Sequence, residues 1–396
     1  MSGGIVQLVA VGAQDAYLSG KPEVSFYRSS YKRYTHFANS VERQLIQGNP
    51  SAGGVSTIRF EKKGDLLSYV YISARDANGA MVPNIDWTSN VIDKVELLIG
   101  GQVIDTQDAY FSTRIEPVTA GQNLNQRFLP IASATQPGYN ANMFYALKFF
   151  FCKDWQSALP LVALQYHDIE LRITWAANLG VTATNVAPSG KYSDLQYILW
   201  SNFIYLDQAE REFFAKTPQD MLITQVQRQF VPQSSSVMEL AFANPVKYLA
   251  FQSNNYATQY TSGGVTNTTS QTASLLQFKT QVNGTDIGES RHLPAWVDAM
   301  QYYHTPVGYM PSGTTANVAI VSFCLDTSKL QPTGTVNFSR IDTYRIITPP
   351  NITLASIVRN AETSIGNAVV TSLYVYAVNY NILRIQNGMG AVLYSS

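Results

Sequence analysis

The stretch FFCKDWQSALPLVALQYHDIE at residues 150–170 aligns without a gap with SFCLDTSKLQPTGTVNFSRID at residues 322–342. Identical residues recur 172 positions apart: Phe151 with Phe323, Cys152 with Cys324, Asp154 with Asp326, Pro160 with Pro332 and Ile169 with Ile341. Polar positions change type, since Arg340 falls opposite Asp168. A catalytic group would keep its residue type, whereas one face of a strand tolerates exchange. Both stretches are therefore interpreted as scaffold, with Pro and Gly marking the turn before a strand.

Two further matches stand in the same order in both halves of the chain. Gly101 of LLIGGQVIDT meets Gly284 of TQVNGTDIGE, and Asn202 of LWSNFIYL meets Asn379 of YAVNYNIL. Similarity that recurs in a fixed order indicates a repeated structural unit. We therefore expect two copies of one domain, joined near residues 207–220.

Strand signals dominate the chain. Runs such as LLSYVYIS, DKVELLIGGQVID and TSLYVYAVNYNILRI are rich in β-branched and aromatic residues and are bounded by turn residues. The Gly-Gly of IGGQ and the Asn-Gly of VNGT predict tight hairpins. Clear helical patterning is confined to YLDQAEREFFAKTPQDM. The pattern predicts an all-β chain with a short helical linker.

About eight strands in each copy favour two consecutive eight-stranded jelly-roll β-sandwich domains, although composition alone leaves other sandwiches open. The expected division of the chain is an N-terminal arm (1–25), a first jelly roll (26–206), a helical linker (207–220) and a second jelly roll (221–396).

Charge is low and balanced. Charged residues make up 14% of the 396, below the roughly 25% that is usual, and Lys+Arg and Asp+Glu both number 27. A chain without a cationic excess has no means of holding a nucleic-acid backbone, so specific nucleic-acid binding is not expected. A polar but uncharged surface suits a subunit packed against many neighbours or a protein that faces polysaccharide.

Catalytic and metal-binding patterns are not found in the sequence. The four histidines stand singly, and no spacing typical of zinc ligands or of a nucleophile occurs. Asp207, Glu210 and Glu212 raise the possibility of a glycosidase, but they fall on the predicted linker helix and are interpreted as solvated positions. Cys152 and Cys324 lie in apolar runs and are expected to be buried free thiols. We predict no enzyme and no cofactor.

Targeting signals are weak. No run reaches the roughly 18 apolar residues of a membrane-spanning helix, and the start MSGGIVQLVAVGA lacks the basic region of a signal peptide. Synthesis inside the cell is the expectation.

Several long strings resemble one protein family: GGIVQLVAVGAQDAYLSGKPEVSFYRSSYKRYTHFA, LPLVALQYHDIELRI, DQAEREFFA, YYHTPVGY, LQPTGTVNFSRID and YAVNYNILRIQNGMGAVLYS. They resemble the major capsid proteins of the nucleocytoplasmic large DNA viruses, the double jelly-roll lineage of algal chloroviruses, prasinoviruses and iridoviruses. The resemblance runs nearly end to end, and the chain is short for the family.

The resemblance implies a homotrimer whose six jelly rolls form a pseudo-hexameric capsomer of an icosahedral shell. Implied partners are neighbouring capsomers and minor capsid and penton proteins, with an internal membrane as a further candidate. The implied location is the virion, after synthesis and assembly in the host cytoplasm. A carbohydrate-binding or carbohydrate-cleaving β-sandwich protein is the alternative, suggested by the many aromatic residues and the low charge.

The stretch FYRSSYKRYTHF (26–37) interleaves Arg28, Lys32 and Arg33 with aromatic residues. Such alternation is typical of single-strand nucleic-acid binding. The favoured interpretation is an arm whose aromatics pack under the first jelly roll and whose bases face the interior of the shell, towards a membrane or partner proteins.

Four N-glycosylation motifs occur, at Asn267, Asn283, Asn337 and Asn351. Asn283 is expected in a hairpin turn and Asn337 in a buried strand, so both are interpreted as incidental. Asn267, in a polar loop, and Asn351 are the glycosylation candidates.

Overall fold

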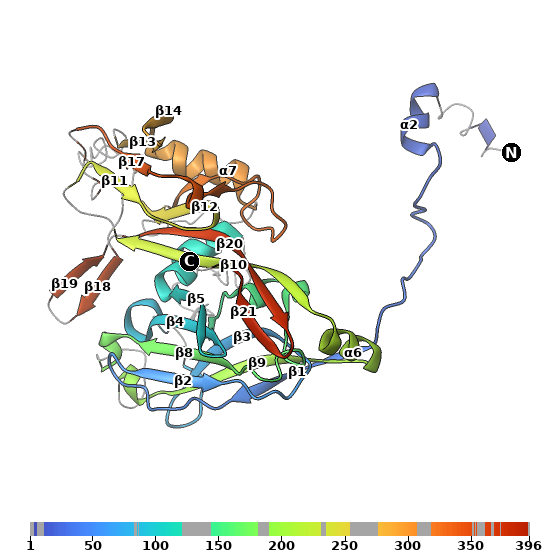
Figure 1. Ribbon diagram of the computed structural model, residues 1–396, viewed down its shortest axis with the longest axis horizontal. Helices are drawn as coiled ribbons and strands as arrows, with labels where there is room; N and C mark the ends of the chain where they lie inside the picture. The colour runs from blue at the N-terminus through green and yellow to red at the C-terminus, as the bar shows by residue number, and fades with distance from the viewer. Residues whose placement is uncertain are drawn as a thin grey trace. The chain divides into compact units, whose positions relative to one another are not determined.

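The computed structural model describes the backbone of residues 4–5, 12–82, 85, 87–120, 144–180, 190–230, 235–253, 276–306, 318–350, 352, 354, 361–365, 368–372 and 374–394 (Figure 1). The chain divides into two compact units, Met1–His36 and Phe37–Ser396. In the described part of the first unit, η1 (Ala13–Asp15) and α2 (Ala16–Ser19) are short helices, and residues 20–36 after them have no regular structure. This unit extends beyond the predicted arm of 1–25.

The described part of the second unit holds two β-sandwiches, each with a four-stranded sheet facing a sheet of five or six strands, and a separate two-stranded hairpin. In the first sandwich, one sheet has the order β1-β9-β3-β6, with β7 also paired to β3, and the other has the order β2-β8-β4-β5. The bounds are β1 (Phe37–Gln44), β2 (Val55–Arg59), β3 (Leu66–Arg75), β4 (Ile92–Ile99), β5 (Gln102–Asp108), β6 (Phe144–Ala146), β7 (Leu159–Pro160), β8 (Ile169–Trp175) and β9 (Gln196–Leu206). Neighbouring strands in both sheets pair antiparallel, and this strand order is the jelly-roll order.

The second sandwich repeats the same order. One sheet runs β10-β20-β12-β15, with β16 paired to β12 and β21 to β20, and the other runs β11-β17-β13-β14. The bounds are β10 (Gln219–Phe230), β11 (Val237–Leu240), β12 (Pro245–Gln252), β13 (Gln277–Val282), β14 (Thr285–His292), β15 (Val318–Ser322), β16 (Val336–Asn337), β17 (Tyr344–Ile347), β20 (Tyr374–Gln386) and β21 (Met389–Val392). A separate hairpin joins β18 (Ala361–Ile365) to β19 (Ala368–Ser372). The predicted double jelly roll is confirmed.

The two predicted hairpins are equivalent turns. Gly100 and Gly101 connect β4 to β5, and Asn283 and Gly284 connect β13 to β14, all four with positive φ between 48° and 82°. Two-residue turns of this kind need φ > 0 at both positions, which Gly and Asn tolerate. The match of Gly101 with Gly284 is therefore confirmed.

The gapless alignment of 150–170 with 322–342 is wrong in register. The amide of Gly100 donates to the carbonyl of Asp168 (2.9 Å), and the equivalent amide of Asn283 donates to that of Thr343 (2.8 Å). Asp168 therefore corresponds to Thr343, not to Arg340. Both stretches still connect equivalent strands, but their loops differ in length.

The two prolines are not equivalent either. Pro160 lies in β7 and pairs with Leu66 at the start of β3. At the start of β12 the corresponding partner of Pro245 is Asn337, while Pro332 lies in the turn region before β16. Asn337 is exposed rather than buried, and its side chain caps η9 (Phe338–Arg340) by accepting from the Ser339 amide (3.0 Å).

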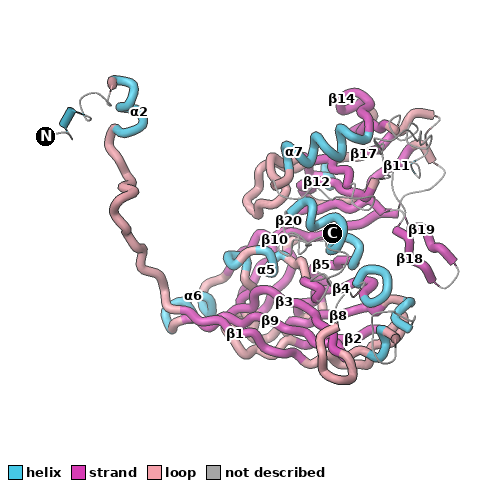
Figure 2. The backbone as a smooth tube through the Cα atoms, turned by 180° about the vertical axis from the view of Figure 1, so that it is seen from behind, coloured by secondary structure: helices cyan, strands magenta, loops and turns pink. Residues whose placement is uncertain are grey.

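Helices occupy three kinds of position (Figure 2). The predicted linker helix is α6 (Gln208–Lys216), and it is confirmed. A helical segment also follows the second hairpin strand of each roll, η3 (Phe111–Ile115) with α3 (Glu116–Ala120) and η8 (Ala295–Ala299) with α7 (Met300–His304). Shorter turns are η2 (Trp87–Val91), α5 (Phe150–Lys153), η4 (Trp155–Ser157), η5 (Ala177–Gly180) and η6 (Tyr192–Asp194). Within the described ranges, none of these helices has the length and apolar character to cross a membrane.

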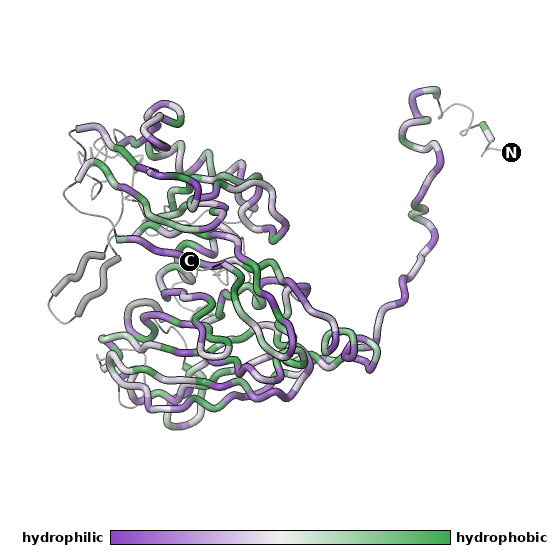
Figure 3. Tube along the Cα trace, viewed as in Figure 1, coloured by the Kyte–Doolittle hydropathy of each residue, from purple (hydrophilic) through white to green (hydrophobic). Residues whose placement is uncertain are grey.

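Each roll has its own core between its sheets. The strand β8 alternates buried and half-buried residues along its length, and Figure 3 shows hydrophobic and hydrophilic residues alternating along such strands. Phe149, Phe151, Trp175 and Phe203 fill the first core, and Phe251 and Phe278 belong to the second. Ile223 and Leu383 from β10 and β20 also pack into the first core, so the long strands of the second roll reach the first.

Candidate functional site: the contact between the two jelly rolls

The helical segment after β5 is buried between the rolls. Phe111 and Ile115 of η3 and Val118 of α3 belong to the first roll, and each is at most 3% exposed. They pack on the outer face of the second roll's sheet, where the cluster comprises Tyr248, Ala250, Val318, Ile320, Tyr376 and Val378. Figure 1 shows this blue-green segment between the two sandwiches. An apolar segment that would be costly in water thus fixes one roll on the other.

The carboxylate of Asp108, the last residue of β5, accepts hydrogen bonds from residues of both rolls. One carboxylate oxygen accepts from the η3 amide of Phe111 (2.8 Å). The other accepts from Arg228 (2.9 Å) of β10 and from the Tyr376 hydroxyl (2.7 Å) of β20. The Arg228 guanidinium also lies 4.9 Å from the centre of the Tyr374 ring. Asp108 therefore starts a helix of the first roll and holds two side chains of the second.

Asp105 lies three residues earlier on the same strand and is 3% exposed. It accepts from the Val226 amide (2.9 Å) across the contact and from the side chain of Gln107 (2.7 Å). Burial raises the pKa of Asp105 to about 6, against the lowering effect of these hydrogen bonds. Beside it, Gln225 donates to the carbonyl of Ile104 (2.5 Å).

Glu116 opens α3 and is 1% exposed. Its carboxylate forms ion pairs with Lys148 (3.2 Å) and Lys153 (3.7 Å). Such ion pairs offset the cost of taking a carboxylate out of water. The pairs tie the helical segment to the loop and helix α5 that follow β6.

The C-terminal hairpin adds a second contact. The turn at Asn387 and Gly388 joins β20 to β21, and the Gly388 carbonyl accepts from the Tyr166 amide (2.9 Å) of the first roll. A Cβ at Gly390 would lie 2.8 Å from a methyl of Leu164, so only glycine fits without displacing that side chain. The rolls are therefore held at two places that lie far apart in the sequence.

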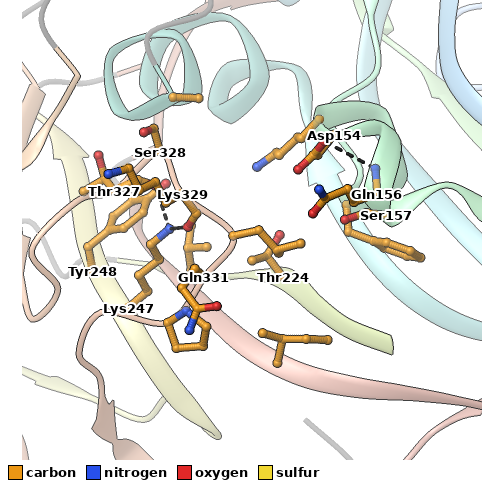
Figure 4. A pocket seen from close by; sticks show the side chains of 17 residues that line it. Asp154, Gln156, Ser157, Thr224, Lys247, Tyr248, Thr327, Ser328, Lys329 and Gln331 are labelled. Atoms are coloured by element: carbon orange, nitrogen blue, oxygen red, sulfur yellow. Dashed lines mark hydrogen bonds between the residues drawn. The ribbon is translucent and has the colours of Figure 1, made fainter. Parts of the chain in front are cut away.

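A cavity of about 480 Å³ opens at this junction. Figure 4 shows Asp154, Gln156 and Ser157 on one wall and Lys247, Thr327 and Lys329 on the other. The Lys247 ammonium donates to the carbonyls of Thr327 (2.8 Å) and Lys329, and burial lowers its pKa to about 8. Asp154 is the one carboxylate among the lining residues, and it caps η4. The lining therefore lacks the pair of carboxylates that glycoside hydrolysis requires.

The acids of the predicted linker have structural partners. Asp207 caps α6 by accepting from the Glu210 amide (2.9 Å), and Glu212 pairs with Lys216 (2.9 Å) one turn later. That pairing lowers the pKa of Glu212. Arg211 pairs with Asp65 (3.1 Å) of the first roll. These contacts stabilise the linker helix and bring no two acids to a common site.

The basic residues Arg28, Lys32 and Arg33 are all exposed in the first unit. The aromatics around them are exposed as well: Phe26, Tyr27, Tyr31 and Tyr34 each keep at least 79% of their surface. That these aromatics pack under the first jelly roll stays a prediction.

Asn267 and Asn351 lie outside the described residues. Asn283 lies in its hairpin turn as predicted, and its side-chain oxygen accepts from the amides of Asp342 and Thr343 (both 3.1 Å).

Both cysteines are free, as expected. Cys324 is 2% exposed, Cys152 is half-buried, and burial raises the pKa of the Cys152 thiol to about 12. A metal site has no support in the described part of the chain, where no three His, Cys, Asp or Glu side chains come together.

The candidate functional site is therefore the contact between the rolls and not a set of reactive groups. Sequence reasoning missed this contact because its residues come from both halves of the chain. The signal that could have found it was the acid Asp108 before AYFSTRIEPVTA, a segment that breaks the strand pattern.

Family models match both halves of the chain: "Major capsid protein N-terminus" over residues 25–207 and "Large eukaryotic DNA virus major capsid protein" over residues 210–391. The chain belongs to this major capsid protein family. Its members are structural proteins of the virion shell, not enzymes, so the carbohydrate hypothesis is not favoured.

Similar proteins agree with this assignment. The chain is 31% identical to the major capsid protein of Paramecium bursaria Chlorella virus 1 and 32% identical to that of Pyramimonas orientalis virus, each over the full length of both chains. A quasi-atomic model of the PBCV-1 capsid matches with a TM-score of 0.70 at 27% identity, covering 94% of this chain and 100% of that one. The Faustovirus major capsid protein shares the fold (TM-score 0.59, 11% identity, 98% of this chain and 99% of that one).

Proposed function

We propose that three copies of this capsid protein form one capsomer, a homotrimer in which six jelly rolls make a pseudo-hexameric ring. The observation that carries this proposal is the fixed contact between two similar rolls, with η3 and α3 buried on the second sandwich. A three-fold trimer of such a chain offers six similar edges, so one gene product covers a nearly hexagonal lattice. The low charge suits a chain whose sides lie against neighbouring capsomers.

The division at the linker is part of this proposal. The first roll would comprise 26–206, the linker 207–220 and the second roll 221–396. The linker helix has no buried residue, which suits a connection between domains rather than a part of either core. Limited proteolysis should cut at the linker before it cuts inside either roll.

The first unit would serve assembly rather than folding. Its exposed aromatics and Arg28, Lys32 and Arg33 suit contacts with minor capsid or penton proteins, or with an anionic internal membrane, on the inner side of the shell. Removing residues 1–20 should leave trimers of normal stability that assemble poorly. If the truncated chain fails to fold, the arm belongs to the jelly-roll core instead.

Light scattering coupled to size exclusion tests the capsomer directly. We expect a particle of three times 43.8 kDa, and three-fold particles by electron microscopy. A chain that remains a 43.8 kDa monomer at capsid-forming concentrations would contradict the proposal. In the same preparation, no affinity for a specific DNA sequence is expected, because the net charge is zero.

Modification and the place of synthesis remain proposals as well. Synthesis and assembly would take place in the host cytoplasm, and Asn267 and Asn351 are the candidate glycan carriers. Mass spectrometry of peptides from purified virions tests the glycans: unmodified Asn267 and Asn351 would remove both sites.

A further inference from the structure

Equivalent positions on the outer sheet faces of the two rolls follow from the pairing registers, in which Trp200 corresponds to Tyr376 and Asn202 to Val378, so the match of Asn202 with Asn379 is wrong by one residue. In the first roll Tyr71 of β3 lies opposite Trp200 and Ala146, and in the second Ala250 of β12 lies opposite Tyr376 and Ile320. Counting back two residues along β3 and β12 makes Tyr69 equivalent to Tyr248. The helices correspond in the same way, because α3 and α7 each follow a five-residue helical turn.

One pair of these surfaces is in contact inside the chain. Thr119, the fourth residue of α3, is hydrogen bonded to the Tyr248 hydroxyl at 3.0 Å, and Val118 beside it is 3% exposed. The helix of the first roll thus lies on the outer sheet face of the second roll.

The other pair has no contact within the described chain that covers it. The third and fourth residues of α7 are Tyr302 and Tyr303, which are 72% and 75% exposed although their counterparts Val118 and Thr119 are buried. On the outer face of the first roll, Tyr69 is 43% exposed. Beside it, the half-buried ring of Tyr71 stacks on that of Trp200 and meets that of Phe144 edge to face. Aromatic pairs of this size stabilise contacts when they are buried.

We infer that α7 of one copy docks on the outer face of the first roll's sheet in a second copy, with Tyr303 against Tyr69. The inference rests on the proposed trimer and names the surfaces that would hold it. The helix and the sheet face are different patches, so the interface is head-to-tail, and such an interface forms a closed ring when its rotation is 120°. Contacts within and between chains would then alternate around the ring.

One feature of the internal contact is not repeated. Arg43 of β1 lies opposite Trp200 as Arg228 lies opposite Tyr376. The counterpart of Asp108, however, is His292, since each ends its strand three residues before the helical segment. The intermolecular contact therefore lacks the partly buried Asp108–Arg228 ion pair of the internal one and depends on its tyrosines.

Cross-linking tests the predicted pair. In the double variant Tyr69→Cys/Tyr303→Cys, a short bis-maleimide should link chains into dimers and trimers on a denaturing gel. Each single variant is a matched control and should stay a monomer on the gel, because a head-to-tail contact needs both cysteines. The wild-type chain controls for Cys152 and Cys324.

Light scattering on Tyr302→Ser/Tyr303→Ser gives the second readout. We expect the trimer dissociation constant to rise at least tenfold with unchanged circular dichroism, while Tyr27→Ser in the first unit leaves it unchanged. Suppose that the wild-type chain trimerises, the serine variant trimerises as tightly, and the cysteine variant gives no cross-link. This inference would then be wrong, and the proposed trimer would stand. A wild-type chain that never trimerises would overturn the proposed function as well.

Discussion

At the scale of single residues, Gly100 meets two constraints that its neighbour Gly101 does not share. Both have positive φ, 58° and 82°, where a side chain strains the backbone. A Cβ at Gly100 would also lie 2.4 Å from the His167 ring, whereas a Cβ at Gly101 would meet open space. The hairpin turn and the packing of His167, just before β8, therefore both require that Gly100 has no Cβ.

The variants Gly100→Ala and Gly101→Ala separate these effects. Gly101→Ala should cost about 1 kcal/mol of the free energy of unfolding, from backbone strain alone. Gly100→Ala should cost about 2 to 4 kcal/mol, because overpacking against His167 is added. Urea titration of both variants measures the difference, and equal costs would show that the His167 ring moves away freely.

The contribution of Asp105 to the stability of the folded protein is expected to depend on pH. Its pKa is about 6 in the folded protein, against 3.8 when solvated, so the folded state holds the extra proton between these values. Its contribution to stability is therefore complete below about pH 4 and is lost as the pH rises through 6, on the order of 3 kcal/mol in total.

The control for this effect is Asp105→Asn, which does not titrate. Relative to this variant, the wild-type chain should gain stability when the pH falls from 7 to 4.5, as measured by urea midpoints at both values. A difference between the two proteins that does not depend on pH would show that Asp105 is solvated.

At the scale of elements, α6 is a helix without buried residues. Its stability must come from its own ends and surface: the Asp207 cap, the Glu212–Lys216 pair and the tie from Arg211 to Asp65. Packing contributes little to such a helix, so its termini decide whether it forms.

Asp207→Ala should therefore destabilise α6 by about 1 kcal/mol, the usual effect of losing an N-cap. Hydrogen exchange of the α6 amides should become roughly five times faster, with the exchange of β9 and β10 unchanged. Asp207→Asn keeps an accepting oxygen and is the matched control. Slowed or unchanged exchange in the alanine variant would contradict the cap's role.

At the scale of the whole molecule, the two rolls share buried surface and should unfold together. Phe111 is fully buried, and its ring centroid lies 5.5 Å from that of Tyr376 across the contact. Its truncation removes apolar contact between the rolls without touching the core of the second roll.

Phe111→Ala should therefore lower stability by about 3 to 5 kcal/mol and split one calorimetric transition into two. Phe278→Ala makes the same chemical change inside the second core and should lower the transition temperature without freeing the first roll from its partner. A single sharp transition in the Phe111 variant would show that the remaining contacts, among them Asp105 with Val226 and the C-terminal hairpin, are enough to couple the rolls.

The sequence by itself determined the repeat, the all-β class, the linker helix and the two hairpins. Apart from the repeat, these are local properties: alternation along a strand, a polar helical run, and Gly or Asn where a tight turn needs positive φ. Residues such as Asn283 carry that information in their immediate neighbours, so it can be read without knowing the fold.

The tertiary structure decided the register of the last strands, the helical segments after β5 and β14, and the contact between the rolls. Asp168 corresponds to Thr343 because backbone hydrogen bonds set the pairing, while loops of unequal length shift the sequence. Phe111 and Asp108 acquire their roles only when Tyr376, more than 260 positions later, is folded beside them. Burial and pairing across such distances depend on the whole chain, and no local pattern records them.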